Sequence, residues 1–312
     1  MLDDDAVRPA SQGHSARVGD VQRGLALGLL AVALFAMTFP MTRLAVGNAD
    51  SPQLSPAFVT AARAALAGVL GAAYLIAARA PWPPRATWRA LAVCAAGTVL
   101  GFPLCIGLAL REVPSMHAAV VSGIIPLATA AVAAVHTGQR PSKGFWLCAA
   151  AGCALVMTFA LWSSGGHWVA ADGWLLAAVA STALAYVAGA RAAAQMPPNH
   201  VVCWVVVGSL PLTVPAAWLS WPEITTISWA AWTGLLYVSV FSMWLGFFAW
   251  YRGLALGGIV RVSQVQLLQP FLALLFAVPI LGEQLHAATV GFALAVAAVV
   301  FVGRRLPVDR PS

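Results

Sequence analysis

Two polar side chains lie inside apolar stretches of this chain and have the same position relative to a proline. Ser122 is four residues before Pro126, and Gln266 is four residues before Pro270. Proline has no backbone N–H, so it leaves the carbonyl four residues earlier without its usual donor. A hydroxyl or an amide beside such a carbonyl could bind a polar solute in surroundings that offer few other partners. Ser122 and Gln266 are therefore the central pair of a candidate binding site.

More polar positions share a helical face with these two residues, at about 100° per residue. The face of Gln266 also holds Ser263, Gln269 and Pro270, and the face of Ser122 holds Ser115, Ala119, Pro126 and Thr129. One interpretation is a polar stripe along an aqueous cavity, where Ser and Gln pair with the ammonium and the carboxylate of a zwitterion. The alternative is that these side chains bond neighbouring helices, or that Ser122 bonds its own backbone.

An aromatic stripe follows the spacing i, i+4, i+7, i+11, i+14 at Tyr237, Phe241, Trp244, Phe248 and Tyr251. Such a face could stack against the apolar part of a solute, or it could face lipid and the membrane interface. Tyr237 and Trp244 are the binding candidates of this stripe.

Two further pairs have i, i+4 spacing, Thr38 with Thr42 and Thr182 with Tyr186. They line a cavity or bond locally to backbone, and we take Thr38 and Tyr186 as candidates. Pro40, Pro126 and Pro270 are expected to kink their helices.

Few ionisable groups fall inside apolar segments. Arg63 either attracts a carboxylate or, in the favoured interpretation, extends to the outer interface. His117 falls nearly opposite Ser122 on the helical wheel, so we do not expect it in the site, and His136 is expected at an interface. Glu112, Asp172 and Glu283 lie at helix ends, where carboxylates are solvated or cap helices.

No cluster of His, Asp or Glu has metal-ligand or acid/base spacing, since the six histidines are scattered. We expect no metal, no cofactor and no enzymatic activity. A passive channel would need a ring of subunits or a charged filter.

Composition sets the fold class. The chain is 61% hydrophobic and 9% charged, against roughly 25% charged in soluble domains, so a soluble globule is excluded. A membrane helix needs about 20 apolar residues. Ten such segments occur, near 22–44, 57–78, 90–110, 115–137, 144–162, 173–190, 200–219, 230–251, 260–281 and 285–303. The sequence predicts an all-α integral membrane protein in a lipid bilayer.

The net charge of +7 is dispersed among the loops, which argues against nucleic acid as a partner. With a cytoplasmic N-terminus, 14 of the 17 cations face the cytoplasm, and only Arg43, Arg63 and Arg111 do not. The positive-inside rule then places both termini in the cytoplasm.

The chain also contains an internal repeat. Gly107-Leu108-Ala109-Leu110 ends the third segment, and Gly253-Leu254-Ala255-Leu256 ends the eighth. In each case the next segment carries Pro126 or Pro270, and a glycine turn follows twelve residues later. Because each repeat has five helices, the second enters the membrane from the opposite side, as in secondary transporters. We expect an N-terminal tail at 1–21, repeats at 22–162 and 173–305, and a C-terminal tail at 306–312.

These landmarks, with Leu281-Gly282-Glu283 after the ninth segment, resemble the EamA-type ten-helix permeases of the drug/metabolite transporter superfamily. The resemblance covers about residues 22–305, but the first repeat has Thr137-Gly138-Gln139 at the matching turn. It implies export of small metabolites, commonly amino acids, across a bacterial inner membrane, and the pattern is most similar to that of exporters of aromatic amino acids. It implies a small-molecule substrate, and no obligate protein partner is evident.

Energy coupling follows from the placement of titratable groups. Every carboxylate lies in a tail, a loop or a helix end, and neither His117 nor His136 aligns with the polar stripes. Alternating access as a facilitator or exchanger is therefore favoured. The alternatives are a proton-coupled exporter of drugs or nucleotide-type metabolites and an integral-membrane enzyme.

The cation asymmetry generates a test of topology. Reporter fusions at Ser312 and in the 79–89 loop should read cytoplasmic, and a tag in 163–171 should be accessible from outside. An externally accessible C-terminus would contradict both the orientation and the inversion of the repeats.

Overall fold

The structure is a computed structural model, and it describes residues 11–137, 140–167, 169–223, 227–257, 262, 265–306 and 308–309. Within these ranges eight helices are long and apolar enough to cross a membrane. Two shorter apolar helices, Val265–Leu281 and Ala287–Gly303, lie where the ninth and tenth segments were predicted. The prediction of an all-α integral membrane protein is confirmed.

The elements of the first half are α1 (Ser11–Ala36), α2 (Thr38–Val46), α3 (Pro56–Ala77), η1 (Arg85–Thr87), α4 (Trp88–Ala95), η2 (Ala96–Gly101), α5 (Phe102–Glu112), α6 (Ser115–Ser122), α7 (Ile125–Thr137) and α8 (Lys143–Ser163). Those of the second half are α9 (Ala170–Ala193), α10 (Pro198–Leu219), α11 (Trp229–Tyr237), η4 (Val238–Leu245), α12 (Gly246–Gly257), η5 (Val265–Leu268), α14 (Gln269–Leu281) and α15 (Ala287–Arg305). Two short strands, β1 (Arg140–Pro141) and β2 (Val308–Asp309), pair antiparallel, with Arg140 opposite Asp309.

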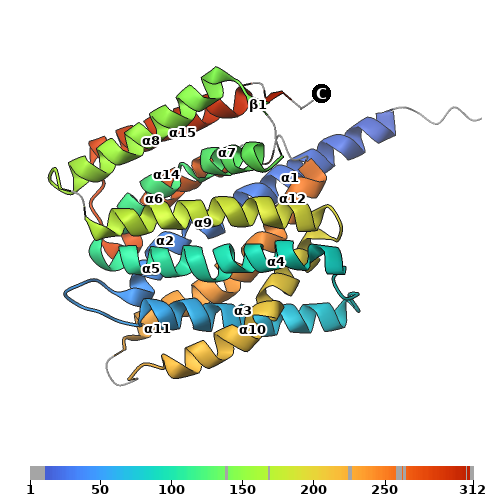
Figure 1. Cartoon of the computed structure of the whole chain (residues 1–312), viewed down its shortest axis with the longest axis horizontal. Helices are drawn as coiled ribbons and strands as arrows, with labels where there is room; N and C mark the ends of the chain where they lie inside the picture. Colours follow the sequence, from blue (N-terminus) through green and yellow to red (C-terminus); the bar gives the residue numbers. More distant parts are fainter. Residues whose placement is uncertain are drawn as a thin grey trace, which may run out of the picture.

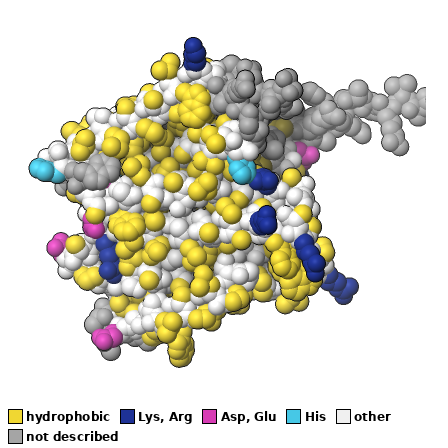
Figure 2. All heavy atoms as spheres, in the orientation of Figure 1, with side chains coloured by type: hydrophobic (Ala, Val, Ile, Leu, Met, Phe, Trp, Pro, Cys, Tyr) yellow, Lys and Arg dark blue, Asp and Glu magenta, His cyan; other side chains and the backbone are white. Residues whose placement is uncertain are grey.

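Helices from the two halves of the chain pack side by side. α8 and α15 form one edge of the bundle, α3 packs on α10 at the opposite edge, and α5 packs on α9 between them (Figure 1). The start of α1 and the end of α15 lie at the same side of the molecule (Figure 1). On the face drawn in Figure 2, hydrophobic side chains cover the middle, and most of the Lys and Arg side chains lie toward the right edge. This apolar belt is the surface that a bilayer requires.

Several membrane helices are interrupted near their middle. The first bends at Met37, between α1 and α2, and the fourth breaks at Gly123 and Ile124, between α6 and α7. The third and eighth contain π-helical segments, η2 and η4. Each break lies close to a proline or inserts extra backbone into the helix, which are the usual causes of such irregularity.

Glycines allow α1 and α12 to cross at backbone contact. A Cβ atom on Gly24 would overlap the backbone of Gly257 and lie 2.9 Å from the carbonyl oxygen of Gly253. Small residues at such crossings are a common way to join helices in lipid, where the hydrophobic effect does not drive helices together. Gly253 begins one of the two Gly-Leu-Ala-Leu landmarks, so this landmark marks a packing contact.

This crossing predicts a stability difference between two glycine variants. Gly24→Ala should destabilise the protein by roughly 1–3 kcal/mol, because the methyl group forces α1 and α12 apart. Gly208→Ala is the matched control, since a Cβ atom there meets nothing within 4 Å and alanine favours helix. Thermal unfolding in detergent measures both, and equal melting temperatures would contradict the crossing.

Candidate binding cavity

A cavity lies between the two halves of the chain at the level of the helix breaks. Its empty volume, including its open side, is about 920 Å³. The walls come from α1, α2, α3, η2, α5, α6, α7, α9, η4, α12, η5, α14 and α15. Interrupted helices around a midplane cavity are the arrangement that secondary transporters use to bind solutes.

Five of the predicted binding residues line this cavity: Thr38, Ser122, Tyr186, Gln266 and Gln269. Pro126 and Pro270 line it too, each as the second residue of a helix, in α7 and α14. Ser263 lies outside the described residues. Ser122 of the fourth segment and Gln266 and Gln269 of the ninth therefore line one cavity, whereas Ser115 and Thr129, chosen by the same helical geometry, do not line it.

Ser122 is the last residue of α6 and is 6% exposed. Its Oγ has no hydrogen-bond partner in the described part of the chain, so it does not bond its own backbone there. Beside it, the Oγ1 of Thr38 and the Oγ of Ser242 lie 2.7 Å apart, which links α2 to η4 across the cavity wall. Ser122 thus lines the cavity with a hydroxyl that no described residue pairs.

The ninth segment is not one continuous helix in the described residues. Gln266 belongs to the 3-10 helix η5, and α14 begins at Gln269. The 3-10 turn is tighter than an α-turn. Both amides nevertheless line the cavity.

The aromatic stripe of the eighth segment lies outside the wall of this cavity. Tyr237 and Trp244 do not line the cavity, and Ser242, Met243 and Phe247 do. The prediction assumed an α-helical period throughout, but η4 is π-helical over Val238–Leu245, so the stripe that starts at Tyr237 in α11 does not continue in phase to Trp244 and the residues after it. No individual residue type in the sequence indicates that η4 is π-helical.

The side chains of the misplaced candidates have other contacts. The hydroxyl of Tyr237 donates to the carbonyl of Leu34 at 3.1 Å, and its ring stacks on Phe241. The ring of Trp244 packs on Phe248. Pro40 lies in α2, three residues after the bend at Met37, and is buried outside the cavity wall.

Arg63 is the residue that the sequence analysis misplaced most clearly. It does not extend to the interface, because it is only 4% exposed and lines the cavity from α3. Its Nε has no hydrogen-bond partner among the described residues. The alternative interpretation, a cation placed to attract a carboxylate, agrees with this position.

The remaining wall is largely aromatic, with Phe35, Phe39, Phe102 and Phe247. A second hollow of about 400 Å³ adjoins it and shares Thr98, Tyr186, Met243 and Phe247 with the first. Valines of α10 dominate its far wall: Val201, Val202, Val205 and Val206. The two hollows together present a polar part and an apolar part.

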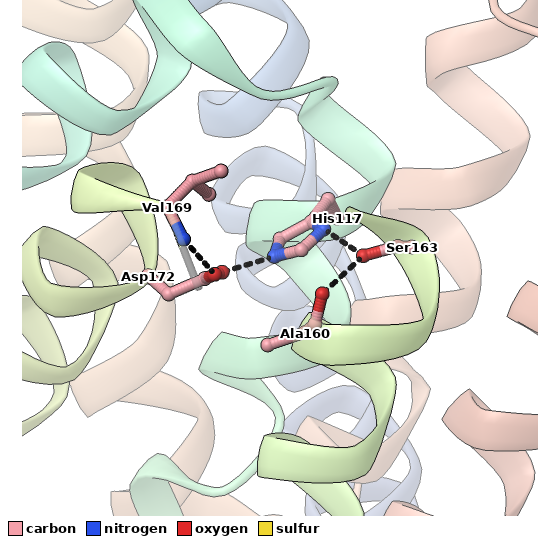
Figure 3. Close-up of polar contacts among 5 residues, drawn as sticks. All are labelled: His117, Ala160, Ser163, Val169 and Asp172. Atoms are coloured by element: carbon pink, nitrogen blue, oxygen red, sulfur yellow. Dashed lines mark hydrogen bonds and ion pairs between the residues drawn. The ribbon is translucent and has the colours of Figure 1, made fainter. Parts of the chain in front are cut away.

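His117 lies away from the cavity, as expected, but in an unexpected cluster. Its Nε2 is 2.8 Å from an Oδ1 of Asp172, and its Nδ1 is 2.7 Å from the Oγ of Ser163 (Figure 3). The cluster joins α6, α8 and α9, and the exposed fractions of His117 and Asp172 are 4% and 2%. Asp172 also accepts from the N–H of Val169, so it caps α9 but is not solvated.

Glu283 caps a helix from the other half of the chain. Its two carboxylate oxygens accept from the backbone N–H groups of Ser115 and Met116, at 2.7 and 3.0 Å, at the start of α6. Carboxylates are stabilised at helix N-termini. This acid of the Leu-Gly-Glu turn therefore holds the fourth segment in place and lies outside the cavity wall.

Comparison with known proteins gives three findings. The sequence model of the EamA-like transporter family matches residues 22–161 and again residues 169–304. The chain is 42% identical over 279 residues to the uncharacterized transporter YdeK of Bacillus subtilis (strain 168), covering 89% of this chain and 96% of the relative. A crystal structure of a protein 18% identical in sequence superposes with a TM-score of 0.60 over 90% of this chain and 96% of its own, which shows the fold alone.

The contrast between Ser122 and His117 predicts opposite effects on stability. Ser122→Ala should leave thermal stability unchanged or raise it, because a buried hydroxyl without a partner costs about 1–3 kcal/mol. His117→Ala should lower it by about 3–5 kcal/mol, because the Asp172 carboxylate stays buried without its partner. Thermal unfolding in detergent compares them. A loss in Ser122→Ala as large as that in His117→Ala would make Ser122 a structural residue.

Proposed function

The chain belongs to the EamA-like transporter family, and from this premise we propose that it exports amino acids, including aromatic or apolar ones, and related small metabolites. The route is a bacterial inner membrane, and both termini lie in the cytoplasm. The mechanism is alternating access, in which two inverted five-helix repeats, 22–162 and 173–305, rock about a fixed binding cavity. That the protein is a transporter and not an enzyme follows from the family; the cargo and the mechanism are our proposal.

One observation carries the choice of cargo. The midplane cavity combines a buried guanidinium, several hydroxyls and two amides with a wall of phenyl rings. A guanidinium binds a carboxylate with two parallel hydrogen bonds. Hydroxyl and amide oxygens accept from an ammonium group, and phenyl rings pack against an apolar side chain. An amino acid with an apolar or aromatic side chain offers all three of these groups.

The roles of single residues follow from their positions. Ser122 lies at the helix break before Pro126, and Gln266 lies just before Pro270. Both bind the polar groups of the cargo, with Gln269, Thr38 and Tyr186 around them. The breaks before Pro126 and Pro270 bring free backbone groups to the same level. Phe35 and Phe247 face the apolar part of the cargo.

A facilitator or exchanger remains the favoured mode of energy coupling. A proton-coupled carrier needs a titratable group that cargo and proton share. No Asp, Glu or His is among the described residues that line the cavity. The solute's own gradient then drives flux, and the empty carrier reorients thermally.

A proton-coupled exporter is the second candidate, because one observation favours it. The buried pair of His117 and Asp172 joins α6 of the first half to α9 of the second. A change of protonation there would alter a contact between the two halves without touching the cargo.

Uptake into proteoliposomes tests the proposal. The purified protein should transport phenylalanine, leucine or a similar amino acid from a panel that also holds nucleosides and cationic dyes. Transport should be saturable and should need no imposed pH gradient, and a protonophore should leave it unchanged. Selective transport of cationic dyes would contradict the cargo, and uptake that collapses with the protonophore would favour the second candidate.

Variants connect this activity to the cavity. Gln266→Leu and Ser122→Leu should each reduce transport strongly at nearly unchanged thermal stability, because they remove a polar partner or fill cavity volume. Phe241→Leu is the control, since Phe241 does not line the cavity and is exposed at 41%. Equal activity in the Gln266 and Phe241 variants would place the cargo elsewhere.

A further inference from the structure

Arg63 has a charge that nothing in the described part of the chain neutralises. It is 4% exposed and lines the cavity, its Nε is unpaired among the described residues, and the ion pair of His117 with Asp172 does not include it. A charge that is removed from water without a partner carries a large desolvation cost. A protein keeps such a group where a ligand supplies the missing partner.

The other two outer cations show what a structural arginine does in this fold. Arg43 donates from its Nη1 to the carbonyls of Leu110 and Val113, at the end of α5. Arg111 donates from its Nη2 to the carbonyl of Leu54 at 3.2 Å, although its Nε, like that of Arg63, has no partner among the described residues. Both satisfy backbone groups at the rim of the bundle, and neither lines the cavity. Arg63 faces the cavity instead.

The acids of the chain cannot supply a counter-charge. The ten acidic residues lie at positions 3, 4, 5, 20, 50, 112, 172, 223, 283 and 309. None of those that the structure describes is in the cavity wall. Most of the segment 258–264 lies outside the described residues, and its sequence contains one arginine and no acidic residue. The charge that the site presents to a cargo is therefore positive.

The rest of the wall fits a molecule with one anionic end and an apolar body. Ser122, Gln266 and Gln269 are neutral and can support the anionic head beside Arg63. The phenyl rings and the adjoining hollow between α9 and α10 are apolar and large enough for a ring or a branched chain. An ammonium group on the same molecule would contact only neutral oxygens, and the nearby guanidinium of Arg63 would repel it.

We infer that Arg63 is the anion subsite of this cavity, and that the preferred cargo is an amphipathic organic monoanion, a carboxylate with an apolar or aromatic body and no ammonium group. This inference rests on the proposed function and shifts the preferred cargo from amino acids to related carboxylates that lack the ammonium group. Zwitterionic amino acids bind more weakly, and cations are rejected.

The charge of the cargo also sets the direction of flux. Each turnover of a facilitator moves one negative charge across the membrane. An interior that is 100 mV negative favours the outside by roughly fiftyfold for a monoanion. The same potential does not act on a zwitterion. The membrane potential then drives export of the preferred cargo without a proton.

A charge series at constant shape tests the inference. The probes are 3-phenylpropionate, phenylalanine and 2-phenylethylamine, which share a phenyl body and carry net charges of about −1, 0 and +1 at neutral pH. Binding to the purified full chain is measured by titration calorimetry. We expect the affinity to fall in that order.

Substitutions then test whether Arg63 causes this order of affinities. Arg63→Gln should weaken binding of 3-phenylpropionate by roughly thirtyfold or more, because a buried ion pair loses one partner. It should leave binding of 2-phenylethylamine unchanged or stronger. Arg63→Lys should keep part of the preference for the anion, and Arg111→Gln, a charge loss outside the cavity, should keep all of it. Melting temperatures are measured beside each affinity, so misfolding is separated from lost binding.

A flux measurement adds a readout that a structural arginine would not change. Proteoliposomes are loaded with 2-phenylethanesulfonate, a permanent anion, and a potassium diffusion potential is imposed with valinomycin. An interior-negative potential should speed efflux of this anion in the wild type, and efflux of phenylalanine should not respond.

The outcomes separate the two levels of the proposal. If phenylalanine binds and is transported but binding does not follow charge and Arg63→Gln is silent, the anion subsite is wrong and the proposed function stands. If 2-phenylethylamine binds best, the inference is overturned. If none of the three probes binds, both the inference and the proposed cargo are wrong.

Discussion

Inside a bilayer no water is available to a polar group, and this constraint governs the whole structure. Most buried polar groups in the described residues are satisfied by the protein. Thr182 and Ser209 donate to carbonyls four residues earlier, and Arg43 donates to the end of α5. Unpaired buried polar atoms remain at Thr42, Thr60, Arg63, Arg111, Ser115, Ser122 and Trp244, and of these residues Arg63 and Ser122 line the cavity. A polar solute in the cavity can offset the free-energy cost of leaving the groups of Arg63 and Ser122 unpaired.

The broken helices explain how a closely packed bundle contains this cavity at all. Pro126 and Pro270 lie at the break between α6 and α7 and at the start of α14, and a proline leaves the carbonyl four residues earlier without its usual donor. The π-helical segments η2 and η4 add residues to the third and eighth membrane helices at the same level, and Thr98, Ser242 and Met243 reach the wall from them. Around the cavity, glycine contacts such as that between Gly24 and Gly257 allow neighbouring helices to pack closely. The irregular segments η2, η4 and η5 thus all contribute residues to the cavity wall.

Much of this architecture was predictable from sequence, because its signals are strong and local. Apolar length predicts the membrane helices, and the matched prolines predict Ser122 and Gln266 as a pair. The aromatic stripe did not predict the cavity wall, because the α-helical period does not hold through η4. Neither Tyr237 nor Trp244 indicates from its residue type that a π-helix forms here. Arg63 was misplaced because its depth in α3 is compatible with either interface or cavity, and only the packing of η2 and η4 against α3 decides between them. The cluster of His117, Ser163 and Asp172 joins three helices that the sequence does not place together.

The central claim is that Ser122 faces an aqueous binding cavity, and its reactivity as a cysteine tests this most directly. In a chain whose five native cysteines are replaced, Ser122→Cys should react with a small water-soluble thiol reagent, and a bound cargo should slow the reaction. Val121→Cys is the control, because Val121 is 1% exposed and does not line the cavity. Reaction at 122 with protection by cargo is the result that the account predicts. A cysteine at 122 as inert as one at 121 would contradict it.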